Sequence, residues 1–494
     1  MNSVMGVDLG TQSIKVIIYQ AETKQLLAQA ACNLDLITDE HGASEQLTEW
    51  WVEGLHHCLN QFDAAIKASV VAMGVSGQQH GFVPVAADGR VLSPVKLWCD
   101  TSTVSECEAI IAAVGGEQAC RELAGNSIAV GYTASKILYL KNNNPDAYQQ
   151  MTSVLLPHDY LNFYLTGQRV MEYGDASGTG LLDIRQRQWC QPLANAIDPD
   201  LIKSLPPFIS AQQAIGAIKP QLAAELGLSD KVIVSSGGGD NMMAAIGTGN
   251  VRAGRLTASM GTSGTLFAYA EQPVVDSSGD LAAFCSSTGG WLPLLCTMNC
   301  TVATERMRAL FEIDVDELEA LATRVPSGSD GVLTLPYYNG ERTPNLPEGK
   351  AVIFGLDMHN SSRGHLLRSA MEAAVFSLKA GLQAFQLQGM LFDELVLTGG
   401  GSRSALWCQI CANVLGLPLK VLVIDECAAF GAALQALWCY QLGQGEKCEL
   451  VSLVDQHLMD VVAAEYQPEI AAVEAYGTVY KQYQQLLAAV KPLY

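Results

Sequence analysis

The chain has 494 residues, of which 49% are hydrophobic and 16% charged, and its formal net charge is -21. Because an acidic surface repels polyanions, we expect neither nucleic acid nor an anionic membrane as a partner. No apolar run approaches the roughly 18 residues of a membrane-spanning helix, and the composition is that of a folded chain, not a disordered one.

The 14 cysteines are scattered singly, mostly inside apolar segments. We expect no signal peptide, because the chain enters a predicted strand almost at once. Unpaired thiols of this kind are typical of a reducing compartment, so we expect a cytoplasmic protein. Cys408 and Cys411 have a redox-like spacing, but they lie in an apolar helical pattern. We interpret them, like Cys296 and Cys300, as core residues.

The first predicted element is a hairpin over residues 5–19, whose first strand ends at Asp8. Its turn, residues 10–13, has the sequence Gly-Thr-Gln-Ser. Main-chain amides and hydroxyls in such a turn can cradle a phosphate. Gly and Ser also make ordinary hairpin turns, so the turn alone leaves both interpretations open.

A helix is expected over residues 44–62 and a strand over 70–75. The strand runs into Gln78, Gln79 and His80, which lie between glycines. Amides and an imidazole offer both donors and acceptors, as recognition of sugar hydroxyls requires. A lone histidine is more often structural, but the two glutamines beside it favour ligand contact.

Trp98 and Asp100 end an extended segment over residues 91–100, and a helix follows. The indole and the carboxylate could lie against a sugar, or they could serve as a core residue and a helix N-cap. Between residues 133 and 165 we expect two helices split by a strand. A polar loop is expected over residues 173–180.

Residues 232–247 are predicted to form a strand, a turn of three glycines and a helix, with Asp240 near the helix start. The glycines let a ligand approach the backbone closely. Asp240 is therefore either a general base for a substrate hydroxyl or a helix cap. This stretch alone does not decide between the two.

The second half of the sequence repeats the pattern of a predicted hairpin with a small polar turn. A second hairpin is predicted over residues 256–269, with a Gly-Thr-Ser-Gly-Thr turn at 261–265. Two such hairpins half a chain apart indicate a duplicated domain that faces itself across a cleft. Further strands are expected over 332–336, 394–398 and 419–423, and further helices over 364–389, 428–442 and 474–490.

A triple glycine and Ser402 follow the strand 394–398, and a helix ending at Leu415 comes next. The amides at the start of that helix favour an anion or a nucleotide. The sequence contains no P-loop, no Gly-x-Gly-x-x-Gly after its first strand and no His-Glu-x-x-His. These absences exclude the usual signatures of P-loop proteins, dinucleotide-binding enzymes and zinc hydrolases.

Taken together, the motifs resemble those of the FGGY family of carbohydrate kinases, in the actin-like ATPase superfamily, and occur in the family's order along essentially the whole chain. They are Asp8-Leu9-Gly10-Thr11, Gly77-Gln78-Gln79-His80-Gly81, Gly238-Gly239-Asp240-Asn241, Gly261-Thr262-Ser263-Gly264, Gly340-Glu341-Arg342-Thr343-Pro344 and Gly399-Gly400-Gly401-Ser402. The second and third look most like those of family members that act on D-xylulose. One departure is that many bacterial members carry an Arg soon after the Trp-x-Asp element, where this chain has Thr101-Ser102-Thr103.

The resemblance implies an α/β fold of two ribonuclease-H-like domains, each a mixed sheet flanked by helices, with the active site in the cleft between them. It assigns sugar binding and the catalytic base to residues 1–245, and nucleotide binding to residues 246–494. It implies transfer of the γ-phosphoryl group of ATP to the C5 hydroxyl of D-xylulose, with Mg²⁺. It is also compatible with a homodimer.

By the same resemblance, Asp240 is the expected catalytic base, and it also contacts the sugar. Gln79, His80 and Asn241 are expected to hold the other sugar hydroxyls, and Asp8 to lie near the Mg²⁺. The nucleotide is expected to contact Gly10, Thr11, Gln12, Gly261, Thr262, Ser263, Gly400, Gly401 and Ser402.

Three alternatives stay open. The first is an FGGY kinase for D-ribulose, L-ribulose, glycerol or gluconate. The second is an actin-like ATPase that works as a nucleotide switch, in which His80 and the Asp240-Asn241 pair would have no role. The third is a catalytically silent sugar sensor, against which the presence of both Asp8 and Asp240 argues.

Overall fold

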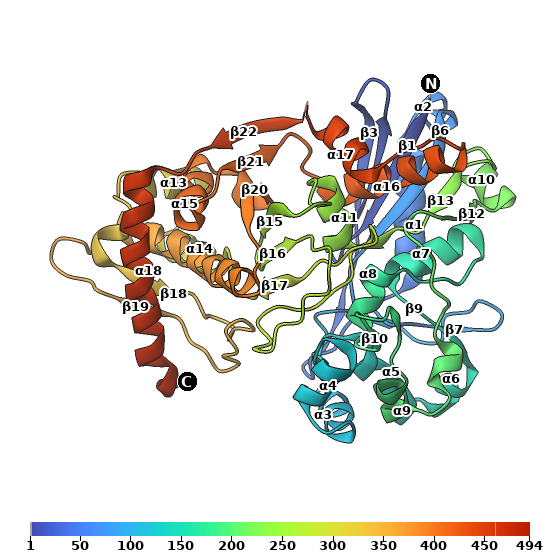
Figure 1. The fold of residues 1–494 in the computed structure, drawn as a ribbon, viewed down its shortest axis with the longest axis horizontal. Helices are drawn as coiled ribbons and strands as arrows, with labels where there is room; N and C mark the ends of the chain where they lie inside the picture. Colours follow the sequence, from blue (N-terminus) through green and yellow to red (C-terminus); the bar gives the residue numbers. More distant parts are fainter. Residues whose placement is uncertain (1, 460) are drawn as a thin grey trace.

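Two mixed β-sheets, each flanked by helices, form the two halves of the protein that lie on the right and left of Figure 1. The computed structural model describes residues 2–459 and 461–494. The expected α/β fold of two mixed-sheet domains is confirmed. Within these described ranges, no helix has the length and apolar character that crossing a bilayer demands.

The first sheet has the strand order β12-β13-β6-β1-β2-β3, with β14 paired to β6. Strands β1, β6 and β13 run parallel, and β2, β3 and β12 are antiparallel to their neighbours. The bounds are β1 Ser3–Leu9, β2 Ser13–Gln20, β3 Gln25–Asn33, β6 Val70–Gly77, β12 Ala214–Ala217, β13 Ile233–Ser235 and β14 Gly238–Gly239.

The second sheet has the strand order β22-β21-β20-β15-β16-β17 and repeats the same pattern of directions. Its central strands β15, β20 and β21 are parallel, and the hairpin β15-β16 corresponds to β1-β2. The duplication inferred from the two hairpins is therefore present in the topology. The bounds are β15 Gly254–Met260, β16 Gly264–Ala268, β17 Leu294–Thr297, β20 Phe392–Thr398, β21 Leu419–Leu422 and β22 Val462–Tyr466.

Helix α16, Cys427–Gly443, lies late in the chain but packs against the first sheet and against α11, Asp240–Gly247. The packing depends on glycines, because a Cβ on Gly431 would lie 1.8 Å from the main-chain oxygen of Met243. A Cβ on Gly6 in β1 would lie equally close, 1.8 Å, to the oxygen of Ala429. This close contact fixes α11, and with it Asp240, against the core.

The remaining elements cover the two sheets and build the outer walls (Figure 1). The helices are α1 Thr48–Asn60, α2 Ala64–Ala68, α3 Val104–Ala113, α4 Glu117–Ala124, α5 Thr133–Asn143, α6 Pro145–Gln150, α7 Pro157–Thr166, α8 Tyr173–Ala176, α9 Gln191–Ile197, α10 Pro220–Leu226, α12 Val302–Phe311, α13 Val315–Thr323, α14 Arg363–Leu387, α15 Ala405–Leu415, α17 Leu450–Leu458 and α18 Ile470–Val490. The short strands are β4 Ile37–Thr38, β5 Ser44–Gln46, β7 Val83–Ala86, β8 Val95–Lys96, β9 Met151–Leu155, β10 Leu182–Asp183, β11 Gln188–Trp189, β18 Leu333–Leu335 and β19 Val352–Phe354.

The helix expected from residue 44 begins only at Thr48, because β5 pairs with β8 instead. The extended segment expected over 91–100 is reduced to β8. Its end turns back because the buried Asp100 carboxylate accepts hydrogen bonds from the Ser44 main-chain N–H at 2.9 Å and from Lys96 at 3.1 Å.

The polar loop expected over residues 173–180 is helical, as α8 followed by a 3₁₀ turn. The cause is the buried carboxylate of Glu172, which accepts hydrogen bonds from the main-chain N–H groups of Gly174 and Asp175. A carboxylate at this position satisfies the free amides of a first helical turn.

Candidate active site

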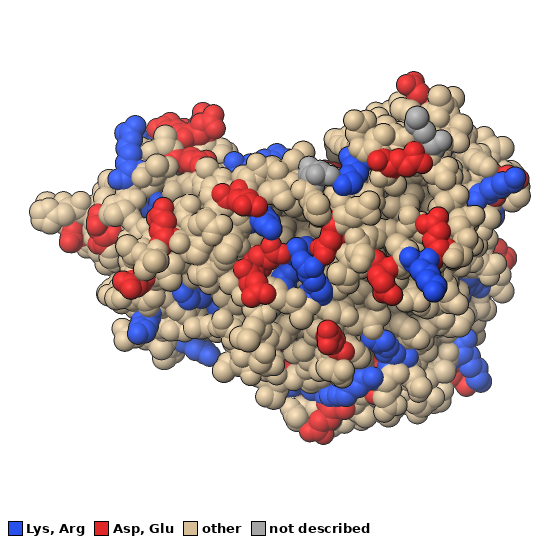
Figure 2. All heavy atoms as spheres, turned by 45° about the horizontal axis from the view of Figure 1, so that its top comes forward, with Lys and Arg blue, Asp and Glu red and all other residues tan. Residues whose placement is uncertain are grey.

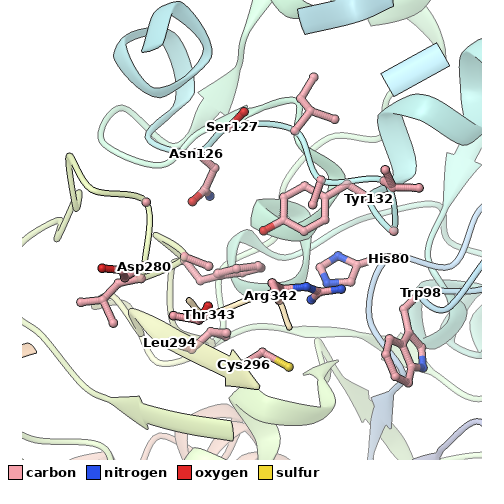
Figure 3. Close-up of a pocket in the computed structure, with 18 of the residues that line it drawn as sticks. His80, Trp98, Asn126, Ser127, Tyr132, Asp280, Leu294, Cys296, Arg342 and Thr343 are labelled. Atoms are coloured by element: carbon pink, nitrogen blue, oxygen red, sulfur yellow. The ribbon is translucent and has the colours of Figure 1, made fainter. Parts of the chain in front are cut away.

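A cavity of about 710 Å³ lies between the two halves of the protein (Figure 3). Residues from both halves line it. On the face drawn in Figure 2, Lys and Arg side chains are interspersed with Asp and Glu side chains. Of the site residues predicted from the sequence, five line this cavity: Gln79, His80, Asp240, Asn241 and Ser263. The remaining predicted residues lie on neighbouring turns, except Asp8, which lies near the end of β1.

Asp240 is the first residue of α11, directly after the glycine strand β14. It does not cap the helix, because Gly239 occupies the N-cap position. Its Oδ1 accepts hydrogen bonds from the Asn241 main-chain N–H at 2.7 Å and from Asn241 Nδ2 at 3.1 Å. Within the described ranges, no hydrogen bond to Oδ2 is found. That oxygen is the one available to a substrate hydroxyl.

The pKa of Asp240 is raised to about 7, first by burial and then by the negative charge of Asp8. A carboxylate with a pKa near neutrality holds a proton more strongly than an exposed aspartate does. General bases need this property, because catalysis is most efficient when the pKa lies near the working pH.

His80 lies on the same side of the cavity, in a left-handed backbone conformation with φ of 66°. Burial, followed by the nearby charge of Lys136, lowers the pKa of His80 to about 3, so the ring is neutral. Its Nδ1 is 2.7 Å from the main-chain oxygen of Gly178 and therefore carries the proton. Nε2 is left as an acceptor for a hydroxyl group.

Tyr132 and Lys136, which belong to none of the motifs described above, hold His80 in place. Tyr132 stacks on its ring, with centroids 4.6 Å apart and an interplanar angle of 22°. Lys136, fully buried on α5, donates hydrogen bonds to the main-chain oxygens of His80 at 2.8 Å and Gly131 at 2.7 Å. A lysine in an otherwise apolar helical face was the available signal for Lys136, whereas the sequence contains none for Tyr132.

Gln79 is oriented by its neighbours on the same wall. Asn241 Nδ2 donates a hydrogen bond of 2.9 Å to Gln79 Oε1. Gln79 Nε2 contacts the sulfur of Met242 at 3.4 Å. Gln79 therefore places the amide of Asn241, in addition to lining the cavity.

Asp8, at the end of β1, lies close enough to Asp240 for its charge to raise the pKa of that residue. Burial raises the pKa of Asp8 itself, and Ser76 Oγ donates a hydrogen bond of 2.8 Å to its Oδ1. The nearby Lys15 is paired with Glu426 at 2.6 Å. Among the described residues, neither Asp8 nor Asp240 forms an ion pair with a basic side chain.

No cluster of three His, Cys, Asp or Glu side chains suited to a metal ion occurs in the described part of the chain. Two neighbouring carboxylates nevertheless fit Mg²⁺, which keeps several waters and is bound through one or two carboxylates together with substrate phosphates. The donor set near Asp8 therefore suits Mg²⁺ that arrives with a nucleotide.

The first hairpin turn touches the cavity through Trp98. Trp98 Nε1 donates a hydrogen bond of 2.9 Å to Thr11 Oγ1, which in turn donates one of 2.9 Å to Gln78 Oε1. Trp98 lines the cavity, whereas Asp100 is fully buried and structural. Gly10 and Gln12 shape the turn through main-chain bonds, from Gly10 N to Ser13 O at 3.0 Å and from Leu34 N to Gln12 O at 2.9 Å.

The second hairpin turn is built in the same way, with Gly261 N bonded to Ser263 O at 3.0 Å. Ser263 lines the cavity, whereas Gly261 and Thr262 bond through their main-chain oxygens to the start of α12, at Thr301 and Cys300. Both turns follow the carboxyl ends of central parallel strands, where ligands bind in α/β sheets.

Gly400, Gly401 and Ser402 form a 3₁₀ turn beside the second hairpin turn. A Cβ on Gly401 would lie 2.8 Å from the Cβ of Met260, so the two segments are in contact. Helix α15 begins only at Ala405, with Ser404 as its side-chain N-cap. The amides expected at a helix start after the glycines therefore lie further along the chain than predicted.

Cys296 was expected in the core, but it lines the cavity because it lies on the face of β17 that is directed there (Figure 3). The expectation for Cys300, Cys408 and Cys411 is confirmed, since all three are buried.

Residues 3–247 match the N-terminal domain of the FGGY family of carbohydrate kinases, and residues 256–440 match its C-terminal domain. The chain is 41% identical to a xylulose kinase of Haemophilus influenzae, over 97% of this chain and 98% of that protein. A crystal structure from Brucella ovis, described as a xyloylose kinase, superimposes with a TM-score of 0.91 at 30% identity, over 100% of both chains. A gluconate kinase from Lactobacillus acidophilus also has a TM-score of 0.91, at 20% identity over 99% of this chain and 98% of that one, which shows the fold alone.

Proposed function

The chain belongs to the FGGY family of carbohydrate kinases, and from this premise we propose that it transfers the γ-phosphoryl group of ATP to the C5 hydroxyl of D-xylulose. The product is D-xylulose 5-phosphate. The observation that carries the proposal is the meeting of Asp240, Asn241 and His80 in one cavity. The choice of sugar is supported by relatives named as xylulose kinases that align over nearly the whole chain.

In the proposed reaction, Oδ2 of Asp240 accepts the proton of the C5 hydroxyl. The hydroxyl oxygen forms a bond to the γ-phosphorus, the bond from that phosphorus to the β,γ-bridging oxygen breaks, and ADP leaves. Because such transfers depend mostly on positioning and charge stabilisation, the hydrogen bonds that fix Oδ1 matter as much as the base itself. Asn241 supplies both of those bonds.

The other sugar hydroxyls are held by the wall around Asp240. His80 Nε2 accepts a hydrogen bond from one hydroxyl, because Nδ1 is already committed to Gly178. Asn241 Nδ2 donates a hydrogen bond of 2.9 Å to Gln79 Oε1. The remaining amide atoms of both side chains are available to the sugar. Prior orientation of these groups reduces the entropic cost of placing the reacting hydroxyl.

We assign the nucleotide to the facing turns, with the phosphates between residues 10–12 and 261–263 and the adenosine end beside Gly400, Gly401 and Ser402. The closeness of the last segment to Met260 supports this arrangement. Mg²⁺ bound with the nucleotide near Asp8 would neutralise phosphate charge. Closure of the two halves around both substrates would exclude water and limit ATP hydrolysis.

We propose that residues 1–245 carry the sugar and the base and that residues 246–494 carry the nucleotide. The exception is α16, which packs on the first sheet. All fourteen cysteines are free thiols, which supports a cytoplasmic location. A homodimer stays a prediction, to be tested by light scattering.

A coupled ADP-release assay tests the proposed function. ATP and Mg²⁺ are held constant while D-xylulose, D-ribulose, L-ribulose, glycerol and gluconate are compared. The proposal expects the highest kcat/KM with D-xylulose. Faster turnover of another sugar would keep the kinase and change its substrate, whereas no sugar-stimulated turnover would favour a sensor.

A further inference from the structure

One cation on the cavity wall takes no part in the reaction described so far. Arg342 comes from the loop of residues 338–344 in the second half of the protein, and its side chain points into the cavity (Figure 3). Within residues 2–459 and 461–494, its guanidinium makes no hydrogen bond and no ion pair. Arg342 is exposed at the rim of this cavity. In a chain with 50 acidic and 29 basic residues, a cation that lines a cavity and has no acidic partner is available to a ligand.

The loop that carries Arg342 is held firmly by its neighbour. The buried carboxylate of Glu341 accepts hydrogen bonds from the main-chain N–H groups of Met298 at 2.7 Å and Arg342 at 2.8 Å. It also accepts one from Asn299 Nδ2 at 3.1 Å, and Asn299 Nδ2 donates a second bond of 2.6 Å to the main-chain oxygen of Gly340. Only the side chain of Arg342 is therefore free to adjust.

Residues 298–299, which donate hydrogen bonds to Glu341, are connected to the second hairpin turn. The next two residues, Cys300 and Thr301, donate main-chain hydrogen bonds to Thr262 and Gly261 at 3.0 and 3.1 Å. Hydrogen bonds thus connect the loop that carries Arg342 to the turn to which we assign phosphates. We expect Arg342 to follow any movement of that turn toward the first half.

The charge of Arg342 affects the pKa of residues at the sugar end of the cavity. It is among the influences on the pKa of His80 and of Tyr132, both in the first half, and of Cys296. Arg342 therefore lies on the part of the cavity wall where His80 and Tyr132 are found.

The chemistry of the two walls is complementary. The first half presents acceptors to the sugar, namely His80 Nε2 and Asp240 Oδ2, as argued above. A guanidinium has only N–H donors and no acceptor. A sugar hydroxyl that donates a hydrogen bond to the first half still has lone pairs, so it can accept one from Arg342. A sugar carbonyl oxygen can only accept, so it also suits a guanidinium.

We propose that Arg342 is the contact that the second half of the protein makes with the bound sugar, and that its hydrogen bonds to sugar oxygens link sugar binding to closure of the cleft. The inference rests on the proposed function and makes Arg342 a substrate-binding residue of the same site.

The test compares Arg342→Ala and Arg342→Lys with wild type. The matched control is Arg324→Ala, an exposed arginine at the end of α13 that lies outside the cavity. We expect Arg342→Ala to raise the KM for the sugar about 10- to 100-fold, as expected when a hydrogen bond from a charged group is lost. The KM for ATP and the Tm should stay unchanged. Arg342→Lys should recover part of the loss, because it keeps the charge without the planar fork.

Closure gives a second readout that a change in folding would not mimic. Small-angle X-ray scattering should show that sugar and ADP together reduce the radius of gyration of wild type and of Arg324→Ala but not of Arg342→Ala. An unchanged sugar KM, or a larger effect on the KM for ATP, would overturn the role of Arg342. An inactive wild type would instead overturn the proposed function, so the two failures are distinguishable.

Discussion

Asn241 donates two hydrogen bonds to one oxygen of Asp240, from its main-chain N–H at 2.7 Å and from its side-chain amide at 3.1 Å. The carboxylate is thereby fixed through Oδ1, and Oδ2 is left for the substrate. The same Asn241 amide donates to Gln79 at 2.9 Å, so the base and the sugar wall are set by one side chain.

Removal of the base should affect the chemical step far more than sugar binding. We expect Asp240→Ala to reduce kcat by roughly 10²–10⁴, the usual contribution of a general base. The KM for D-xylulose should change only a few-fold, since His80 and Asn241 remain. Steady-state ADP release measures both constants. Asp230→Ala, at an exposed position in the same half, is the control and should behave as wild type. A kcat within threefold of wild type in Asp240→Ala would remove this residue from the mechanism.

The raised pKa of Asp240, about 7, predicts the direction of the pH dependence. The base works when ionised, and a raised pKa means that protons occupy it at higher pH than usual. We therefore expect kcat/KM for the sugar to be constant above about pH 8 and to fall up to tenfold per unit below about pH 7. His80, with a pKa of about 3, stays neutral over this range, so it contributes no pH-dependent change of its own to the profile.

The profile is recorded from pH 5.5 to 8.5 with wild type and Asp240→Asn. The variant should retain low activity without the acidic limb, because it has no carboxyl group to titrate at this position. A flat wild-type profile, or the same limb in both proteins, would assign the titration to another group.

His80 should contribute to sugar affinity alone. His80→Ala removes the acceptor Nε2, so we expect the KM for D-xylulose to rise about 10-fold while the KM for ATP stays unchanged. Because His80 has a φ of 66°, asparagine is, among residues other than glycine, well suited to the left-handed backbone. His80→Asn should therefore keep the Tm of wild type. Equal losses for both substrates would indicate that His80 acts through the fold instead.

Gly431 should be critical for the packing of α16 on α11. An alanine Cβ would lie 1.8 Å from the Met243 oxygen, so Gly431→Ala forces backbone shifts. We expect it to lower the free energy of unfolding by about 1–3 kcal/mol. Gly443→Ala is the matched control, since it lies on the same helix with no atom within 4 Å of its Cβ. It should leave the Tm equal or slightly higher, because alanine favours a helix. A Tm for Gly431→Ala equal to that of Gly443→Ala would contradict the packing argument.

The parts of the fold that could be predicted are those that a short stretch of sequence determines. β-Branched runs and the small polar turns at residues 10–13 and 261–265 locate both hairpins, and the paired sheets repeat one topology as expected. Asp240 and Asn241 could be found because they follow a glycine turn at a strand end. Each of these features depends on neighbours within a few residues.

The residues that hold the site in position could not be predicted, because their roles depend on contacts between segments that are distant in the sequence. Tyr132 stacks on His80 from the start of α5, 52 positions later in the chain. Lys136 is buried only because two main-chain oxygens satisfy it. Residues 173–180 looked like a loop because the capping carboxylate, Glu172, lies just outside that stretch.

The most direct measurement is the position of the phosphate on the product. D-xylulose labelled with ¹³C is incubated with the protein, ATP and Mg²⁺, and the ³¹P–¹³C couplings of the product are recorded by NMR. Phosphate coupled to C5 and C4, with nothing formed by Asp240→Ala on the same timescale, is the predicted result. Phosphate at C1, or release of ADP without any phosphorylated sugar, would contradict transfer to the C5 hydroxyl.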